Sequence, residues 1–168
     1  PHDGATVEIN WSFRAHHFTN RLDTWKARHS HGGGPIRFYG IHLLALTSSL
    51  GYCAVEYSVL KPNDSDEPTC WHAKLLGSEL PPCELNVCTD SDDMKFEVNF
   101  VSGSKQKTVL DLDQPFALER STLLDPRVSV LYHLVDEINN PSEKSLAIYD
   151  RVNTLWELIE IELKSNRN

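Results

Sequence analysis

The segment Val7-Glu8-Ile9-Asn10-Trp11-Ser12-Phe13 decides the fold class, because apolar and polar residues alternate along it without a break. A β-strand with one face in a core and the other in water produces this two-residue period. The same period recurs at residues 55–59 and 94–100. Further strands are predicted at 22–27, 36–46, 69–75, 84–88 and 108–112.

Turn residues separate these segments, as at Gly32-Gly33-Gly34-Pro35, Pro81-Pro82 and Ser102-Gly103-Ser104. Glycine reaches backbone angles that other residues avoid, and proline cannot donate to a strand ladder. About eight short strands at such spacing predict an antiparallel β-sandwich. We assign residues 1–118 to this β-sandwich domain.

The period changes after residue 118. Asp125-Pro126 is a suitable start for a helix over about 125–138, and Asn140-Pro141 starts a second helix that should reach Lys164. A short link between two helices makes them antiparallel neighbours. The predicted class is therefore α+β: a β-sandwich of about eight strands followed by a C-terminal αα-hairpin at 119–168.

The second helix carries a wide apolar stripe at spacings of three and four residues, formed by Tyr149, Val152, Trp156, Ile159 and Leu163. The stripe is wider than one partner helix can cover. One interpretation packs it on the sheet, and the other presents it to a second protein chain. Tryptophan is enriched at binding hot spots, which makes Trp156 the residue to test.

Composition and charge reduce the number of function classes that are compatible with the sequence. The chain has 168 residues, 40% of them apolar and 24% charged, which is typical of a globular protein. No apolar run approaches the roughly 20 residues of a membrane span. The net charge of −8 argues against general nucleic-acid binding, which needs a cationic surface. Residues 1–60 hold six of the eight histidines and more positive charge, so either an acidic partner or complementarity within the fold is expected there.

Four cysteines lie at positions 53, 70, 83 and 88 without a C-x-x-C pair, which disfavours a zinc ribbon. We expect a reducing compartment, the cytoplasm or the nucleus. Two glycosylation triplets, Asn10-Trp11-Ser12 and Asn63-Asp64-Ser65, keep secretion as the alternative. Whether the cysteines pair stays open.

Candidate catalytic groups are incomplete. His29 and His31 could chelate a metal from one face of a strand, but no third ligand follows at a recognisable spacing. Cys70 and His72 could form a thiol–imidazole pair, but no orienting residue accompanies them. His-Gly-Gly-Gly resembles an oxyanion loop, yet the chain has no G-x-S-x-G. We therefore predict no enzyme, no catalytic residue, no metal and no cofactor, with a hydrolase or metal-dependent enzyme as the alternative.

A basic and aromatic stretch spans residues 13–39, where arginines and a lysine alternate with aromatic rings. Such a pattern suits single-stranded nucleic acid, an acidic peptide or the two faces of ordinary strands. Within it, Arg37 and Tyr39 are predicted to contact a partner.

Residues 11–101 resemble a TRAF/MATH-type sandwich, in particular the substrate-binding domain of seven-in-absentia-like ubiquitin ligases. The matching pieces are Phe13–Phe18, Arg37–Leu43, Val55–Leu60, Trp71–Ala73 and Met94–Val101. The chain departs from that family by lacking a late Trp-Gly pair and by adding the helical hairpin, and a pleckstrin-like barrel competes as the fold. The resemblance implies a non-enzymatic domain that binds extended peptides along a sheet edge and self-associates. The predicted function is a protein–protein interaction module, an adaptor or scaffold subunit that binds a peptide or forms a homodimer, with no membrane partner.

Overall fold

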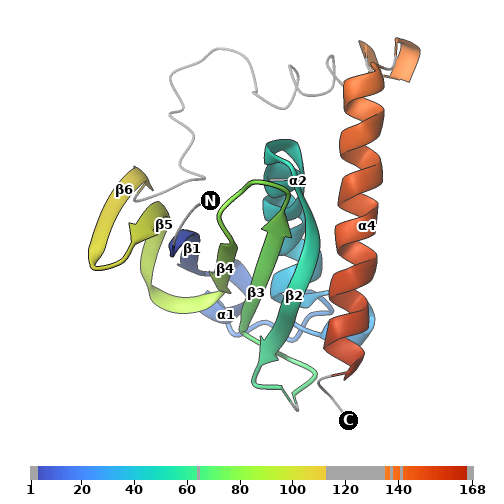
Figure 1. The fold of residues 1–168 in the computed structure, drawn as a ribbon. Helices are drawn as coiled ribbons and strands as arrows, with labels where there is room; N and C mark the ends of the chain where they lie inside the picture. The colour runs from blue at the N-terminus through green and yellow to red at the C-terminus, as the bar shows by residue number, and fades with distance from the viewer. Residues whose placement is uncertain (1–3, 64, 113–134, 137, 141, 166–168) are drawn as a thin grey trace, which may run out of the picture.

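The computed structural model describes residues 4–63, 65–112, 135–136, 138–140 and 142–165 (Figure 1). Eleven elements follow one another along these described residues. They are β1 (Ala5–Arg14), α1 (His16–Thr19), the 3-10 turn η1 (His29–His31), the π-helical turn η2 (Ile36–Gly40), α2 (Ile41–Leu50), β2 (Tyr52–Lys61), β3 (Cys70–Gly77), β4 (Cys83–Cys88), β5 (Asp90–Ser102), β6 (Lys105–Leu112) and α4 (Glu143–Ser165).

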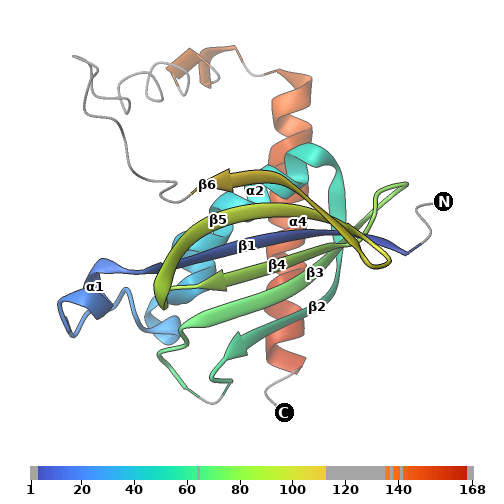
Figure 2. The same cartoon turned by 90° about the vertical axis from the view of Figure 1, so that its left-hand side faces the viewer.

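The described strands form a single six-stranded sheet in the order β2-β3-β4-β1-β5-β6. β1 and β4 run parallel, and the other neighbouring strands are antiparallel. Figures 1 and 2 show α2 and α4 on the same side of this sheet, while no described element covers the opposite side. The prediction of an eight-stranded sandwich was therefore wrong, although the α+β class is confirmed.

The two missing strands lie between β1 and β2. Residues 36–46 form η2 and the start of α2 instead of a strand, and residues 22–27 form turns. A continuous apolar run has no clear period, so the sequence does not distinguish a buried strand from a buried helix. In the structure, Ile36, Gly40, Leu43, Leu44 and Thr47 are buried at helical spacing. The run is a helix because its buried positions recur every three or four residues.

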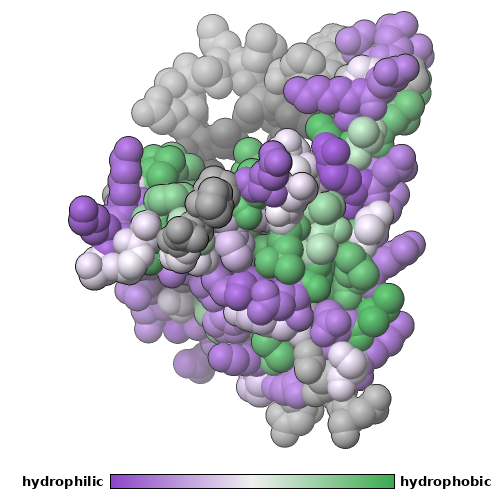
Figure 3. Space-filling model, in the orientation of Figure 1, coloured by the Kyte–Doolittle hydropathy of each residue, from purple (hydrophilic) through white to green (hydrophobic). Residues whose placement is uncertain are grey.

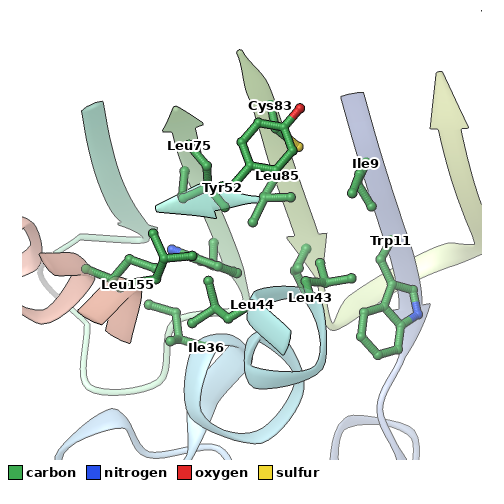
Figure 4. Packing of buried hydrophobic residues seen from close by; sticks show 14 of the residues in the cluster. Ile9, Trp11, Ile36, Leu43, Leu44, Tyr52, Leu75, Cys83, Leu85 and Leu155 are labelled. Carbon is green, nitrogen blue, oxygen red and sulfur yellow. The ribbon is translucent and has the colours of Figure 1, made fainter. Parts of the chain in front are cut away.

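The core lies between the sheet and the two helices. Ile9 and Trp11 enter it from β1, Leu43 and Leu44 from α2, and Leu155 from α4 (Figure 4). Each of these side chains is at most 4% exposed. The alternation that predicted the first strand is thus the alternation between this core and the open side of the sheet.

The C-terminal region differs from the predicted hairpin. The described part contains one long helix, α4, which packs against β2 and α2. The first helix of the hairpin, predicted over about 125–138, and the domain boundary after residue 118 fall mainly in 113–134, outside the described residues. The interpretation in which the apolar stripe packs on the sheet agrees with the position of α4.

No helix in the described residues is long and apolar enough to cross a membrane.

Candidate functional site

The structure distributes the predicted partner-binding residues of α4 between the core and the surface. Ile159 and Leu163 are buried in the core of the chain itself. Trp156 is half-buried and packs against that core, whereas Tyr149 is 52% exposed. In Figure 3, hydrophobic surface gathers where α4 lies beside β2. Internal packing accounts for the buried half of the stripe, and Tyr149 is the member that remains accessible.

Arg37 and Tyr39 are held within the fold. Arg37 forms an ion pair with Glu160 of α4 at 2.9 Å, and it donates a further hydrogen bond to the His29 carbonyl at 3.2 Å. Tyr39 is half-buried, and its ring lies 4.8 Å from that of Phe13. Arg37 therefore fastens the 29–37 segment to α4.

The metal and thiol alternatives lack a complete site. Among the described residues, no group of three histidine, cysteine or acidic side chains is placed to hold a metal ion. Cys70 forms a disulfide with Cys88 across β3 and β4, so it offers no free thiol to His72. The ring of His72 instead lies 2.6 Å from the amide oxygen of Asn86.

The basic stretch at 13–39 is largely neutralised by the fold. Arg14 pairs with Asp90 and Asp92 at 3.1 and 3.0 Å. Arg28 pairs with Asp23 and Glu67. Since Phe13 and Tyr39 also pack inside, the cations and rings do not form the open stacking track that single-stranded nucleic acid requires.

The same stretch builds a pocket of about 490 Å³ beyond the end of the sheet. In Figure 2, α1 lies past the end of β1, where the chain leaves the sheet. The β2–β3 loop closes the other side of the pocket. The lining residues are His17, Phe18, Arg21, Leu22, Asp23, Ala27, Arg28 and Glu67. Loops on a rigid sheet are the usual place for binding residues.

A clamp between two loops positions the pocket wall. The backbone N–H of His29 donates to the Asp66 carbonyl at 2.7 Å. The Asp66 carboxylate accepts from the N–H and the hydroxyl of Ser30, at 2.8 and 2.7 Å. These two hydrogen bonds hold the pKa of Asp66 below its ordinary value. The carboxylate stays ionised and keeps the β2–β3 loop against η1.

The glycine run at 32–34 allows the backbone to fold tightly at this position. A Cβ on Gly33 would come within 2.2 Å of the Trp25 carbonyl oxygen. The N–H groups of Gly33 and Gly34 donate to the carbonyls of Arg28 and Lys26, each at 2.8 Å. The backbone of 25–34 is therefore folded tightly onto itself, and only glycine fits at position 33.

The two arginines of the pocket differ in their partners, because Arg28 contacts two carboxylates and Arg21 contacts none. Asp23 raises the pKa of Arg28, and Glu67 adds a hydrogen bond to the same guanidinium. Arg21 has a left-handed backbone with φ of 50°, which is uncommon for a residue with a side chain. No described residue forms an ion pair or hydrogen bond with the Arg21 side chain.

His17 is 6% exposed and still lines the pocket. Burial lowers the pKa of His17, with Lys26 and His16 acting in the same direction and Asp90 and Glu67 opposing them. Its imidazole is therefore neutral near pH 7 and carries one donor and one acceptor nitrogen. Neither nitrogen has a hydrogen-bond partner among the described residues.

A second surface lies on the outer side of η2 and α2. Phe38, His42, Leu46 and Leu50 recur every four residues, and the last three are exposed. Trp25 is 50% exposed and contacts Phe38 at 6.1 Å between ring centres. Once 36–50 is known to be helical, this spacing identifies one exposed stripe along η2 and α2.

No protein-family model matches the chain, and no curated protein matches it in sequence. Solved structures match it in fold. WlbA dehydrogenase from Bordetella pertussis, in complex with NADH and UDP-GlcNAcA, superposes with a TM-score of 0.60 at 10% identity, over 93% of this chain and 52% of that one. GenD2 from gentamicin A biosynthesis, in complex with NAD, gives 0.56 at 13% identity, over 92% and 53%. A putative NADPH-dependent oxidoreductase from Desulfitobacterium hafniense gives 0.55 at 13% identity, over 97% and 57%.

The chain has the fold of one half of these oxidoreductases. It spans a little over half the length of the structures that it matches. This likeness corrects the TRAF/MATH and seven-in-absentia resemblance, which rested on spaced aromatic residues that many sheets share.

The likeness also overturns the prediction of a non-enzymatic adaptor or scaffold module. The structures that share this fold are dehydrogenases and oxidoreductases. The earlier prediction rested on the lack of a complete catalytic set within the chain.

Proposed function

We propose that this chain is the substrate-side half of an NAD(P)-dependent oxidoreductase. The observation that carries the proposal is the fold match, which takes in nearly all of this chain but only 52–57% of each oxidoreductase. The remaining part of such an enzyme would come from another segment of the polypeptide or from a separate chain.

The residues of this chain do not fit a dinucleotide. The sequence contains no G-x-G-x-x-G loop, and the described sheet has one parallel pair of strands. A dinucleotide-binding fold uses a parallel, doubly wound sheet with its phosphates at a glycine-rich helix start. The dinucleotide therefore belongs to the other half, and we assign no reaction step to it here.

The outer stripe of α2 is the surface proposed to face the other half. An exposed apolar stripe is costly in water unless it is covered, and Leu46 and Leu50 are 40% and 57% exposed. His42 lies within this stripe, so docking would place an imidazole at the junction of the two halves. Histidine is the side chain most often used for proton transfer in enzymes.

The test uses the native assembly that contains this chain, purified through a tag on the chain. We expect the assembly to bind NADH or NADPH, measured as energy transfer from protein tryptophan to the reduced nicotinamide. The isolated 168-residue chain should give no such signal. An assembly that binds neither dinucleotide contradicts the proposal, and so does tight binding by the isolated chain.

Two variants test whether the outer stripe of α2 faces the other half of the enzyme. Leu46→Glu should prevent assembly because it buries a charge in the proposed junction. Ile161→Glu, at an exposed position of α4, is the matched control and should assemble normally. Equal assembly of both variants would place the junction elsewhere.

A further inference from the structure

We propose that the pocket between α1 and the β2–β3 loop, lined by His17, Arg21 and Arg28, binds a small 2-hydroxycarboxylate. The site lies wholly within this chain and does not depend on the proposed oxidoreductase function.

The size and shape of the pocket suit a small molecule. Its volume of about 490 Å³ falls in the range of ordinary ligand sites. Phe18 and Leu22 supply apolar wall, and Leu22 is 49% exposed with no core around it. A ligand with a short apolar group would cover these side chains.

The charges select a carboxylate. The pocket holds two arginines and two carboxylates, but Asp23 and Glu67 are both directed at Arg28. Both carboxylates therefore contact Arg28, and neither forms an ion pair with Arg21. No described residue accepts a hydrogen bond from the Arg21 guanidinium, so all its N–H donors are open to a ligand. A guanidinium binds a carboxylate through two parallel hydrogen bonds.

His17 selects a hydroxyl. The His17 ring lines the pocket and forms no hydrogen bond with a described residue, so a ligand in the pocket can be its hydrogen-bond partner. Because His17 is neutral, it can accept the hydrogen bond of a hydroxyl without a second charge. Arg21 and His17 come from the same short segment, which suits a hydroxyl and a carboxylate on one carbon skeleton.

Arg21 has a left-handed backbone with φ of 50°. Positive φ is uncommon in residues other than glycine, and Arg21 and Glu79 are the two such residues among those described.

The experiment uses three probes that differ by one group each. Mandelate carries the hydroxyl, the carboxylate and an apolar ring. Phenylacetate lacks the hydroxyl, and 1-phenyl-1,2-ethanediol lacks the carboxylate. Binding to the 168-residue chain is measured by titration calorimetry and by the NMR shifts of the His17 ring.

We expect saturable binding in the order mandelate, phenylacetate, diol, with each lost group weakening affinity at least tenfold. Arg21→Gln should weaken mandelate binding at least tenfold, and Arg21→Lys should weaken it less. Lys107→Gln, on the exposed strand β6, is the control and should bind as the parent does.

His17→Gln should reduce the preference for mandelate over phenylacetate while leaving phenylacetate binding unchanged. Unfolding curves for each variant ensure that folded proteins are compared. The proposal is overturned if none of the probes binds, if the diol binds as tightly as mandelate, or if Arg21→Gln has no effect.

Discussion

Gly40 lies directly against the indole ring of Trp71, so closely that a Cβ at position 40 would come within 2.7 Å of Trp71 Cζ3. Trp71 is fully buried in β3, and its Nε1 donates a hydrogen bond to the Ser58 hydroxyl at 2.9 Å. The indole therefore cannot move aside. This contact sets how close η2 and α2 approach the sheet, and it places the outer stripe of α2 on the far side.

Gly40→Ala should destabilise the protein by about 1–3 kcal/mol, because the added methyl overpacks a filled core. In an exposed helix the same change would stabilise the protein by about 1 kcal/mol. The sign of the change in the free energy of unfolding therefore shows whether position 40 is packed against the indole. Urea unfolding provides the measurement. Trp71→Leu opens space next to Gly40, and Gly40→Ala should cost less in that background. A stabilising Gly40→Ala in the parent protein would mean that the contact is absent.

The strands that could be predicted from sequence are those with one face in the core and the other on the open side of the sheet. Residues 7–13 alternate because one side of β1 enters the core and the other side belongs to the open face. Residues 69–75 and 84–88 were also placed correctly, as β3 and β4. The run 36–46 was misassigned because apolar residues are present on both the buried and the exposed side of the helix, which removes the period.

The candidate pocket could not be predicted because its parts are distant in sequence. Arg28 and Glu67 are 39 residues apart and meet through a loop whose position depends on Asp66 and Ser30. The sequence around His17 does not indicate a pocket. Its burial beside a pocket depends on α1, a four-residue helix with no side-chain cap.

Ile159→Ala should lower the free energy of unfolding by about 2–5 kcal/mol, since it leaves a cavity in the core between α4 and the sheet. Ile159 is fully buried, whereas Ile161 on the same helix is 58% exposed. Ile161→Ala is therefore the matched control and should change stability by about 0.5 kcal/mol or less. Equal losses for the two variants would contradict the orientation of α4.

The cysteines should divide into three chemical classes. Cys53 is exposed and free, so iodoacetamide should modify it in the native protein. Burial raises the pKa of the Cys83 thiol to about 12, and nearby Glu84 adds to the effect, so Cys83 should react only after unfolding. Cys70 and Cys88 should appear as one linked pair in a digest without reductant. Mass spectrometry should find one label per native chain, and labelling of Cys83 in the native protein would contradict its burial.

The stability of the protein should fall on acidification because of His17. Burial, Lys26 and His16 hold its pKa in the folded state below the ordinary value of about 6.5, against the opposing effect of Asp90 and Glu67. As the pH drops below about 6.5, the unfolded chain takes up a proton that the folded chain does not bind until a lower pH is reached. The contribution of His17 is therefore complete above pH 6.5 and decreases through the window below it. His17→Gln should flatten the dependence of the unfolding midpoint on pH in that window, and His42→Gln, at an exposed position, should leave it unchanged. A parent protein whose stability rises between pH 6.5 and 5, with His17→Gln removing the rise, would mean that His17 gains a proton on folding and is not desolvated.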